Sequence, residues 1–148
     1  MLPDELKTMP FYSLVEIGCG NGDLLVRLAV RQPQASFIGI EPDMALAGAT
    51  ARRIDRLALN HRVSIQQADI FDTGVETGWA DVVLYRLSYQ QLLTTEAALR
   101  EAARLLKPGG CLYTHDGACL SKIDLIELHE HLLHAGRLAE SYPLAVAC

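Results

Sequence analysis

The chain has 148 residues, of which 50% are apolar and 21% charged, and its net charge is -5. This composition is typical of one folded domain and excludes a disordered chain, while the acidic balance argues against a dedicated nucleic-acid-binding protein. No apolar run is long enough to cross a membrane, and the first residues lack the basic start and the apolar stretch of a signal peptide. We therefore expect a cytoplasmic protein with reduced cysteines and no membrane partner.

Short apolar runs alternate with helical patterns along the chain. In these runs apolar residues do not alternate with polar ones, which is typical of parallel strands covered on both faces. The runs are residues 13–17, 37–40, 63–65, 81–85 and 111–114. The alternation predicts an α/β fold with a doubly wound, mostly parallel Rossmann-like sheet. No linker interrupts the pattern, so residues 1–148 are predicted to form a single domain.

The predicted helices have recognisable ends. One helix spans Asp23 to Arg31, and the next is expected to open at Pro42 and to run to about Leu59. A stripe from Leu99 to Leu106 predicts a third helix, ended by a turn at residues 107–110 with Lys107 at the negative end of the helix dipole. A capping box formed by Ser121 and Asp124 is expected to start the last helix.

The loop after the first strand is rich in glycine. Gly18, Gly20 and Gly22 form a G-x-G-x-G pattern at a strand-to-helix turn, where ligands of such sheets bind. A dinucleotide fingerprint would place a third glycine at position 23, where the chain has Asp23. Because an aspartate there would repel a pyrophosphate, the loop favours a less negatively charged ligand.

Acidic residues follow the next two strands. Glu41 can accept hydrogen bonds from a ribose diol, and Asp69 beside Ile70 can accept from an adenine amino group. A solvated strand end for Glu41 and an ordinary turn residue for Asp69 are the simpler alternatives.

Together these segments resemble the class I S-adenosylmethionine-dependent methyltransferases. The similarity covers roughly residues 13–117 and rests on residues 16–22, 39–41, 68–70 and 105–110. It implies S-adenosylmethionine as cofactor, with the glycines around its methionine part, Glu41 on the ribose, and Asp69 with Ile70 on the adenine. The cofactor-binding residues implied in this way are Glu16, Gly18, Cys19, Gly20, Asn21, Gly22, Glu41, Pro42, Asp69, Ile70 and Tyr85.

Candidate catalytic residues follow the fourth and fifth strands. Arg86 would steer an anionic acceptor, Tyr89 would line the pocket, and His115 is the best candidate base, because histidine titrates near neutral pH. A base is needed only if the acceptor must lose a proton, and a purely structural role stays open for each residue. We expect a small or medium-sized acceptor methylated at oxygen, nitrogen or carbon.

Two other patterns are assigned no site. The segment His129–His134 lacks the H-E-x-x-H spacing of zinc proteases, so no metal is expected, although His131 and His134 lie one turn apart. The second strand also resembles that of tRNA guanine-N7 methyltransferases, which keeps an RNA methyltransferase open. A local basic cluster, interpreted as a solvated helix face, consists of Arg52, Arg53, Arg56, His61 and Arg62.

The length is short for this family. Twelve residues precede Ser13, and Arg137 to Cys148, expected to form either one broken strand or a very short hairpin, follow the last predicted helix. Three interpretations stay open: a compact enzyme completed by a second copy or partner subunit, a non-catalytic S-adenosylmethionine-binding partner or pseudoenzyme, and a fragment. An enzyme is favoured because the cofactor motifs are intact, and an NAD-dependent oxidoreductase is least favoured.

Overall fold

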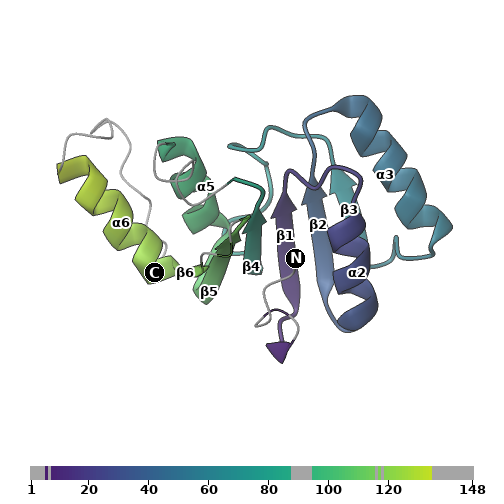
Figure 1. The fold of residues 1–148 in the computed structure, drawn as a ribbon, viewed down its shortest axis with the longest axis horizontal. Helices are drawn as coiled ribbons and strands as arrows, with labels where there is room; N and C mark the ends of the chain where they lie inside the picture. Colours follow the sequence, from purple (N-terminus) through teal and green to yellow (C-terminus); the bar gives the residue numbers. More distant parts are fainter. Residues whose placement is uncertain (1–5, 7, 88–94, 116, 118, 135–148) are drawn as a thin grey trace. The chain divides into compact units, whose positions relative to one another are not determined.

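The computed structural model of the chain describes residues 6, 8–87, 95–115, 117 and 119–134. The chain divides into two compact units, residues 1–73 and 74–148, and each unit has strands and helices of its own (Figure 1). The prediction of one domain over residues 1–148 stays a prediction.

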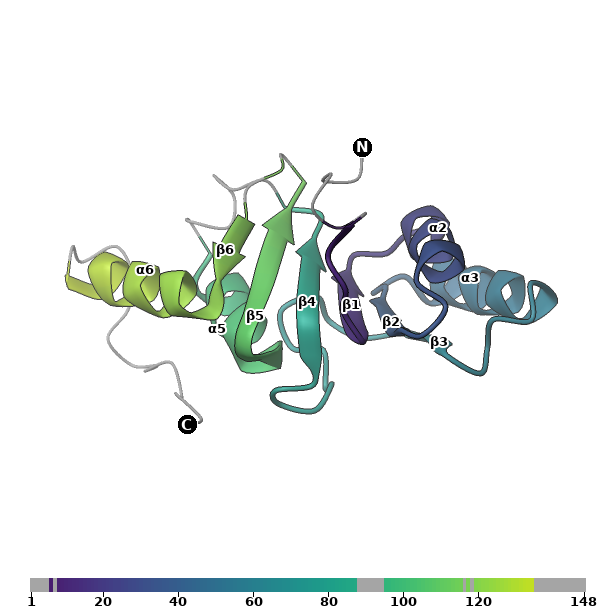
Figure 2. The ribbon, with the colours of Figure 1, turned by 90° about the horizontal axis from the view of Figure 1, so that it is seen from below.

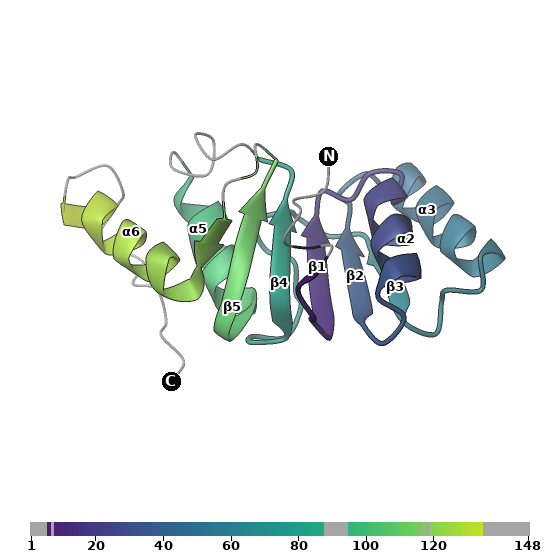
Figure 3. The same ribbon diagram turned by 60° about the horizontal axis from the view of Figure 1, so that its bottom comes forward.

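The first unit is a parallel α/β arrangement with strand order β3-β2-β1. Ile17 pairs with Ile40, and Ile40 with Gln66, so the three strands end at the same edge. Helix α2 packs against β2, and helix α3 packs against β3 (Figure 3). The elements are β1 (Ser13–Ile17), α2 (Asp23–Arg31), β2 (Ser36–Ile40), α3 (Met44–Arg56) and β3 (Val63–Gln66).

The core of the first unit follows from the apolar pattern of its sequence. All five residues of β1 are buried, and α2 turns Leu25, Leu28 and Ala29 inward. The rings of Phe11 and Phe37 meet edge to face, with their centroids 6.0 Å apart. This packing fixes the strands whose carboxyl ends carry the predicted site.

Arg62 closes the opposite end of the same unit. Its guanidinium donates hydrogen bonds to the carbonyl oxygens of Ala29, Gln32 and Ala35, around the C-terminus of α2. It also lies 6.0 Å from the ring centroid of Phe37. Arg62 therefore has a structural role, which corrects its assignment to a solvated basic face.

In the second unit, β4 and β5 are parallel and β6 is antiparallel to β5. Helix α6 packs against β5 and α5 (Figure 2). The elements are β4 (Ala80–Tyr85), α5 (Glu96–Leu105), β5 (Leu106–Thr114), β6 (Cys119–Ser121) and α6 (Lys122–His134). The predicted α/β class with a mostly parallel Rossmann-like sheet is confirmed.

Several predicted boundaries differ from those observed. Helix α3 begins at Met44 with Asp43 as its N-cap, so Pro42 precedes the cap instead of opening the helix. Helix α5 ends at Leu105, and residues 107–110 form the irregular first part of β5 rather than a separate turn. Lys107 forms an ion pair with Asp81 at 3.0 Å, a contact that the helix dipole alone does not predict.

The start of α6 is as predicted. The N–H of Ser121 donates to the Asp124 carboxylate at 2.7 Å, and the N–H of Asp124 donates to the Ser121 hydroxyl at 3.1 Å. This reciprocal pair is a capping box.

Strand β6, immediately before α6, was not predicted. Residues 137–148, proposed as a possible last strand or hairpin, lie outside the described residues. Within the part of the chain that the structure describes, no helix is long and apolar enough to cross a membrane.

Candidate functional site

The glycine loop has a backbone that only glycine adopts readily. Gly18, Gly20 and Gly22 have φ angles of 78°, 56° and 72°. The N–H groups of Gly18 and Cys19 both donate to the carbonyl oxygen of Ile40, at 2.8 and 2.9 Å, which ties the loop to the end of β2. The loop is thus a fixed turn at the carboxyl edge of the strands.

The side chain of Cys19 lies on the core side of this loop. It is fully buried, and a Cβ added to Gly39 would lie 2.8 Å from its sulfur. Gly39 therefore makes room for the Cys19 side chain, and Cys19 presents its main chain rather than its thiol at the loop surface. Glu16, in β1 just before the loop, is also fully buried.

Glu41 holds the loop from the end of β2. Its Oε2 accepts a hydrogen bond from the N–H of Gly20 at 3.0 Å, and its Oε1 accepts one from the N–H of Asp43 at 3.0 Å. The residue is only 8% exposed. The interpretation of Glu41 as a merely solvated strand end is therefore wrong, since its carboxylate links two loops of the first unit.

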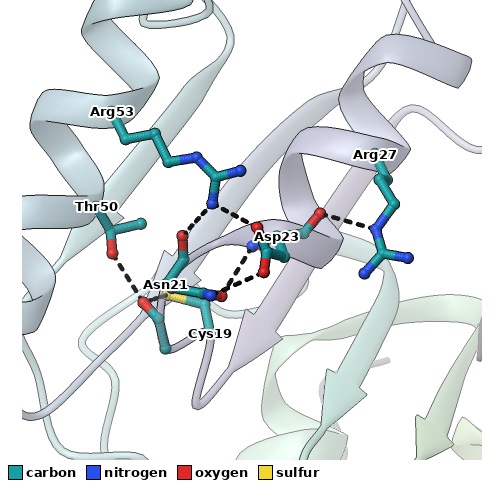
Figure 4. Close-up of polar contacts among 7 residues, drawn as sticks. Cys19, Asn21, Asp23, Arg27, Thr50 and Arg53 are labelled. Atoms are coloured by element: carbon teal, nitrogen blue, oxygen red, sulfur yellow. Dashed lines mark hydrogen bonds and ion pairs between the residues drawn. The ribbon is translucent and has the colours of Figure 1, made fainter.

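Helix α3 reaches the same loop with two side chains (Figure 4). The Thr50 hydroxyl donates to the Gly20 carbonyl oxygen at 2.8 Å. The Arg53 guanidinium donates to the Asn21 carbonyl oxygen at 2.8 Å and forms an ion pair with Asp23 at 2.6 Å. Neither role was predicted from the sequence, because a threonine and an arginine inside a helix carry no motif.

Asp23, the first residue of α2, is bonded to the loop and to α3. Its carboxylate accepts from Arg53 and from the Asn21 amide, the latter at 2.7 Å. The bond from Arg53, followed by that from Asn21, lowers the pKa of Asp23 below its ordinary value. The charge of Asp23 is therefore balanced by Arg53, so repulsion of a pyrophosphate is weaker than the sequence alone suggests.

Asp69 lies in the loop after β3. Its Oδ1 accepts a hydrogen bond from the N–H of Phe71 at 2.7 Å, so the carboxylate forms the side-chain turn that is common for aspartate. The same loop contacts the loop after β2, because the Gln67 amide donates to the Pro42 carbonyl oxygen at 3.4 Å. Pro42 and Asp69 are exposed, and Ile70 is half-buried.

The second unit contains the candidate catalytic residues. Tyr85 pairs with Thr114 at the ends of β4 and β5, which places Arg86 and His115 directly after two neighbouring strands. The N–H of His115 donates to the Leu87 carbonyl oxygen at 3.1 Å, and both Arg86 and His115 are exposed. Tyr85 is buried, and Tyr89 lies outside the described residues.

The first unit brings the predicted cofactor-binding residues of its three strand ends to one edge of the sheet. A Cβ at Gly22 would lie 2.7 Å from the Thr50 methyl carbon, so the loop has no room for a side chain there. Beside this loop, Glu41 supplies acceptor oxygens, and Asp69 follows the third strand. Among the described residues, no group of three or more His, Cys, Asp or Glu side chains could hold a metal ion.

Comparison with known proteins identifies the family. A sequence model described as "Methyltransferase domain" matches residues 14–110. The chain belongs to this family. The resemblance predicted from the sequence is thereby confirmed, and the match covers the glycine loop, Glu41, Asp69 and Arg86.

Relatives of this methyltransferase domain act on different acceptors, according to their names. The tRNA (guanine-N(7)-)-methyltransferase of Mycoplasmopsis pulmonis is 29% identical over 119 residues, which are 72% of this chain and 59% of that protein. The trans-aconitate 2-methyltransferase of Deinococcus radiodurans is 31% identical over 104 residues, which are 70% of this chain and 37% of that protein. The chain thus spans less than two thirds of either relative.

A solved structure shows the same fold. Geranyl diphosphate C-methyltransferase from Streptomyces coelicolor, in complex with Mg2+, geranyl diphosphate and S-adenosyl-L-homocysteine, matches this methyltransferase domain with a TM-score of 0.62 at 25% identity. The match covers 70% of this chain and 38% of that one. The shared region is therefore a minor part of the larger protein.

Proposed function

We propose that this chain binds S-adenosylmethionine at the carboxyl ends of β1, β2 and β3 and transfers its methyl group to a small or medium-sized acceptor. The observation that carries the proposal is the position of Glu41. Its carboxylate lies at the end of β2, within hydrogen-bond distance of the glycine loop at the end of β1. A ribose acceptor and a glycine turn, side by side at one edge of a parallel sheet, form a nucleoside site.

The first unit supplies the binding groups in this proposal. The main chain of residues 18–22 lies against the methionine part, and Glu41 accepts from the ribose hydroxyls. Each carboxylate oxygen has two lone pairs, so both oxygens of Glu41 keep an acceptor position beyond the bonds to Gly20 and Asp43. Asp69 keeps its second oxygen for the adenine amino group, while Oδ1 holds the turn at Phe71.

The chemistry itself belongs to the cofactor, whose sulfonium supplies an electrophilic methyl group. The task of the chain is to bind and orient the two reactants. In the second unit, Arg86 would attract an anionic acceptor, and His115 would remove a proton where the acceptor has one to lose. The acceptor atom is oxygen, nitrogen or carbon.

The named relatives support an anionic small molecule as acceptor. Trans-aconitate and geranyl diphosphate, which occur in the names of two of them, are both organic anions. An exposed arginine directly after β4 suits such an acceptor. Arg86→Ala would then raise KM for the acceptor more than it lowers kcat, whereas Arg31→Ala, at an exposed arginine in the last turn of α2, would alter neither.

An RNA methyltransferase is the second candidate, because 72% of this chain aligns with a tRNA methyltransferase. The basic cluster gives this candidate little support, since Arg53 and Arg62 bind carbonyl oxygens within the first unit. Arg52, Arg56 and His61 are the exposed members. Transfer of labelled methyl groups to tRNA, abolished in Arg52→Ala/Arg56→Ala, would favour this candidate.

Calorimetry and a transfer assay test the proposal together. We expect S-adenosylmethionine and S-adenosylhomocysteine to bind and NAD not to bind. Binding of NAD, without binding of either adenosyl ligand, would favour an oxidoreductase and overturn the proposal. Binding of both adenosyl ligands without transfer to any of a broad panel of carboxylates, diphosphates, amines and phenols would instead indicate a non-catalytic partner subunit.

A further inference from the structure

We infer that Thr50 and Arg53 of α3 are positioning residues. They set the affinity for the methionine part of the cofactor by binding two carbonyl oxygens of the glycine loop. Neither residue belongs to a cofactor motif. The inference rests on the proposed function, because it assigns the loop to that part of S-adenosylmethionine.

Thr50 contacts the loop with both branches of its side chain. Its hydroxyl donates to the Gly20 carbonyl oxygen at 2.8 Å, and its methyl carbon lies 2.7 Å from the place where a Cβ on Gly22 would stand. Thr50 is 2% exposed, and its hydrogen bond to the loop is partly buried. The hydroxyl therefore holds the Gly20 peptide group, while the methyl group fills the space beside Gly22.

Arg53, one turn further along α3, contacts the other half of the loop. It donates to the Asn21 carbonyl oxygen at 2.8 Å and pairs with Asp23, the first residue of α2. Asp23 in turn is tied to Asn21, whose amide donates to it at 2.7 Å. Arg53 therefore fixes the point where the loop enters α2 (Figure 4).

Both backbone polar groups of Gly20 are hydrogen-bonded to side chains. Glu41 binds its N–H, and Thr50 binds its C=O, so the peptide groups on both sides of Gly20 are held. Glu41 also binds the N–H of Asp43, which caps α3 at Leu46. The loop is thus fixed by one side chain from the end of β2 and two from α3. A loop fixed before binding loses less conformational entropy when the ligand arrives.

Two substitutions remove these hydrogen bonds with little change in volume. Thr50→Val replaces the hydroxyl with a methyl group, and Arg53→Met keeps a long side chain without the guanidinium. Each has a matched control: Thr50→Ser keeps the hydroxyl, and Arg52→Met removes an exposed arginine from the neighbouring position. Thermal unfolding of every variant shows whether the chain still folds.

The test compares S-adenosylhomocysteine with adenosine by calorimetry. Adenosine lacks the methionine part. A change in the loop should therefore lower the affinity for S-adenosylhomocysteine and leave the affinity for adenosine unchanged. We expect Thr50→Val, which removes one hydrogen bond, and Arg53→Met, which removes the bonds to Asn21 and Asp23, each to weaken S-adenosylhomocysteine binding by about three- to tenfold. We expect adenosine affinity, and both ligands in the control variants, to stay within about twofold of the unsubstituted chain.

Amide hydrogen exchange of residues 18–23, measured without ligand, gives a second and independent result. Exchange should be faster in both variants than in their controls, because the loop opens more often. Unchanged exchange, unchanged S-adenosylhomocysteine affinity, or an equal loss of adenosine affinity would each overturn the inference. Failure of the unsubstituted chain to bind S-adenosylhomocysteine would instead overturn the proposed function.

Discussion

The Glu41 carboxylate accepts a hydrogen bond from the backbone N–H of Gly20 at 3.0 Å, although 21 positions separate the two residues in the sequence. The residue proposed to bind the ribose therefore also orders the loop proposed to bind the methionine part. A substitution at position 41 should therefore weaken cofactor binding in two ways: it removes the acceptor for the ribose, and it loosens the glycine loop.

Gly22→Ala should destabilise the first unit for two separable reasons. The φ angle of Gly22 is 72°, which costs a residue with a Cβ about 1–2 kcal/mol. The new Cβ would also lie 2.7 Å from the Thr50 methyl carbon. We expect the free energy of unfolding in urea to fall by about 2–4 kcal/mol in total.

Gly74→Ala is the matched control for this prediction. Gly74 has the same φ angle of 72°, but nothing lies within 4 Å of an added Cβ. It should therefore show only the backbone cost. Gly22→Ala combined with Thr50→Ser, which removes the clashing methyl group, should recover part of the stability. Equal effects of Gly22→Ala and Gly74→Ala would show that the contact with Thr50 is unimportant.

Arg62→Ala should lower the free energy of unfolding by about 1–3 kcal/mol, because it removes hydrogen bonds to three carbonyl oxygens around the end of α2 and a cation–π contact. The guanidinium binds Ala29, Gln32 and Ala35 and lies over the ring of Phe37. Arg52→Ala, at an exposed position, should change it by less than about 0.5 kcal/mol. Equal stability of the two variants would return Arg62 to the solvated basic face that the sequence suggests.

Asp124 should make the stability of the second unit sensitive to acid. Its hydrogen bonds with the Ser121 hydroxyl and N–H lower the pKa of Asp124 below the ordinary value of 3.8. The folded pKa lies below the unfolded one, so the stabilisation is complete above about pH 5 and is lost as the pH falls through the folded pKa.

Asp124→Asn tests this pH dependence. Near pH 7 it should unfold at a lower urea concentration than the unsubstituted chain, and the difference should shrink below about pH 3. Glu127→Gln, an exposed change in the same helix, serves as control. A difference that is constant from neutral to acidic pH would contradict the capping role of the Asp124 carboxylate.

Much of the fold could be predicted from local signals. The predicted helix from Asp23 to Arg31 has the observed bounds, and the capping box at Ser121 and Asp124 is present. Both depend on residues close together in sequence. The segment at residues 107–110 was predicted as a turn because of its Pro-Gly-Gly sequence, whereas pairing with β4 draws it into a strand. Pairing between distant segments has no local signal.

The candidate site shows the same division. The glycine loop and Glu41 could be found from the sequence, because their spacing follows from the strand ends of a parallel sheet. Thr50 and Arg53 could not, since nothing in the sequence distinguishes them from other polar residues of α3. Their contacts depend on how α3 lies against the loop, some 30 positions earlier in the sequence.

The central claim is that Glu41 belongs to an S-adenosylmethionine site, and calorimetry with S-adenosylhomocysteine tests it most directly. The unsubstituted chain should bind. Glu41→Ala should bind more weakly by about 1–3 kcal/mol, roughly 5- to 150-fold, because charge-assisted hydrogen bonds are removed. Glu76→Ala, an exposed carboxylate in the other unit, should bind like the unsubstituted chain. No heat with the unsubstituted chain, or equal affinity after Glu41→Ala, would contradict the claim.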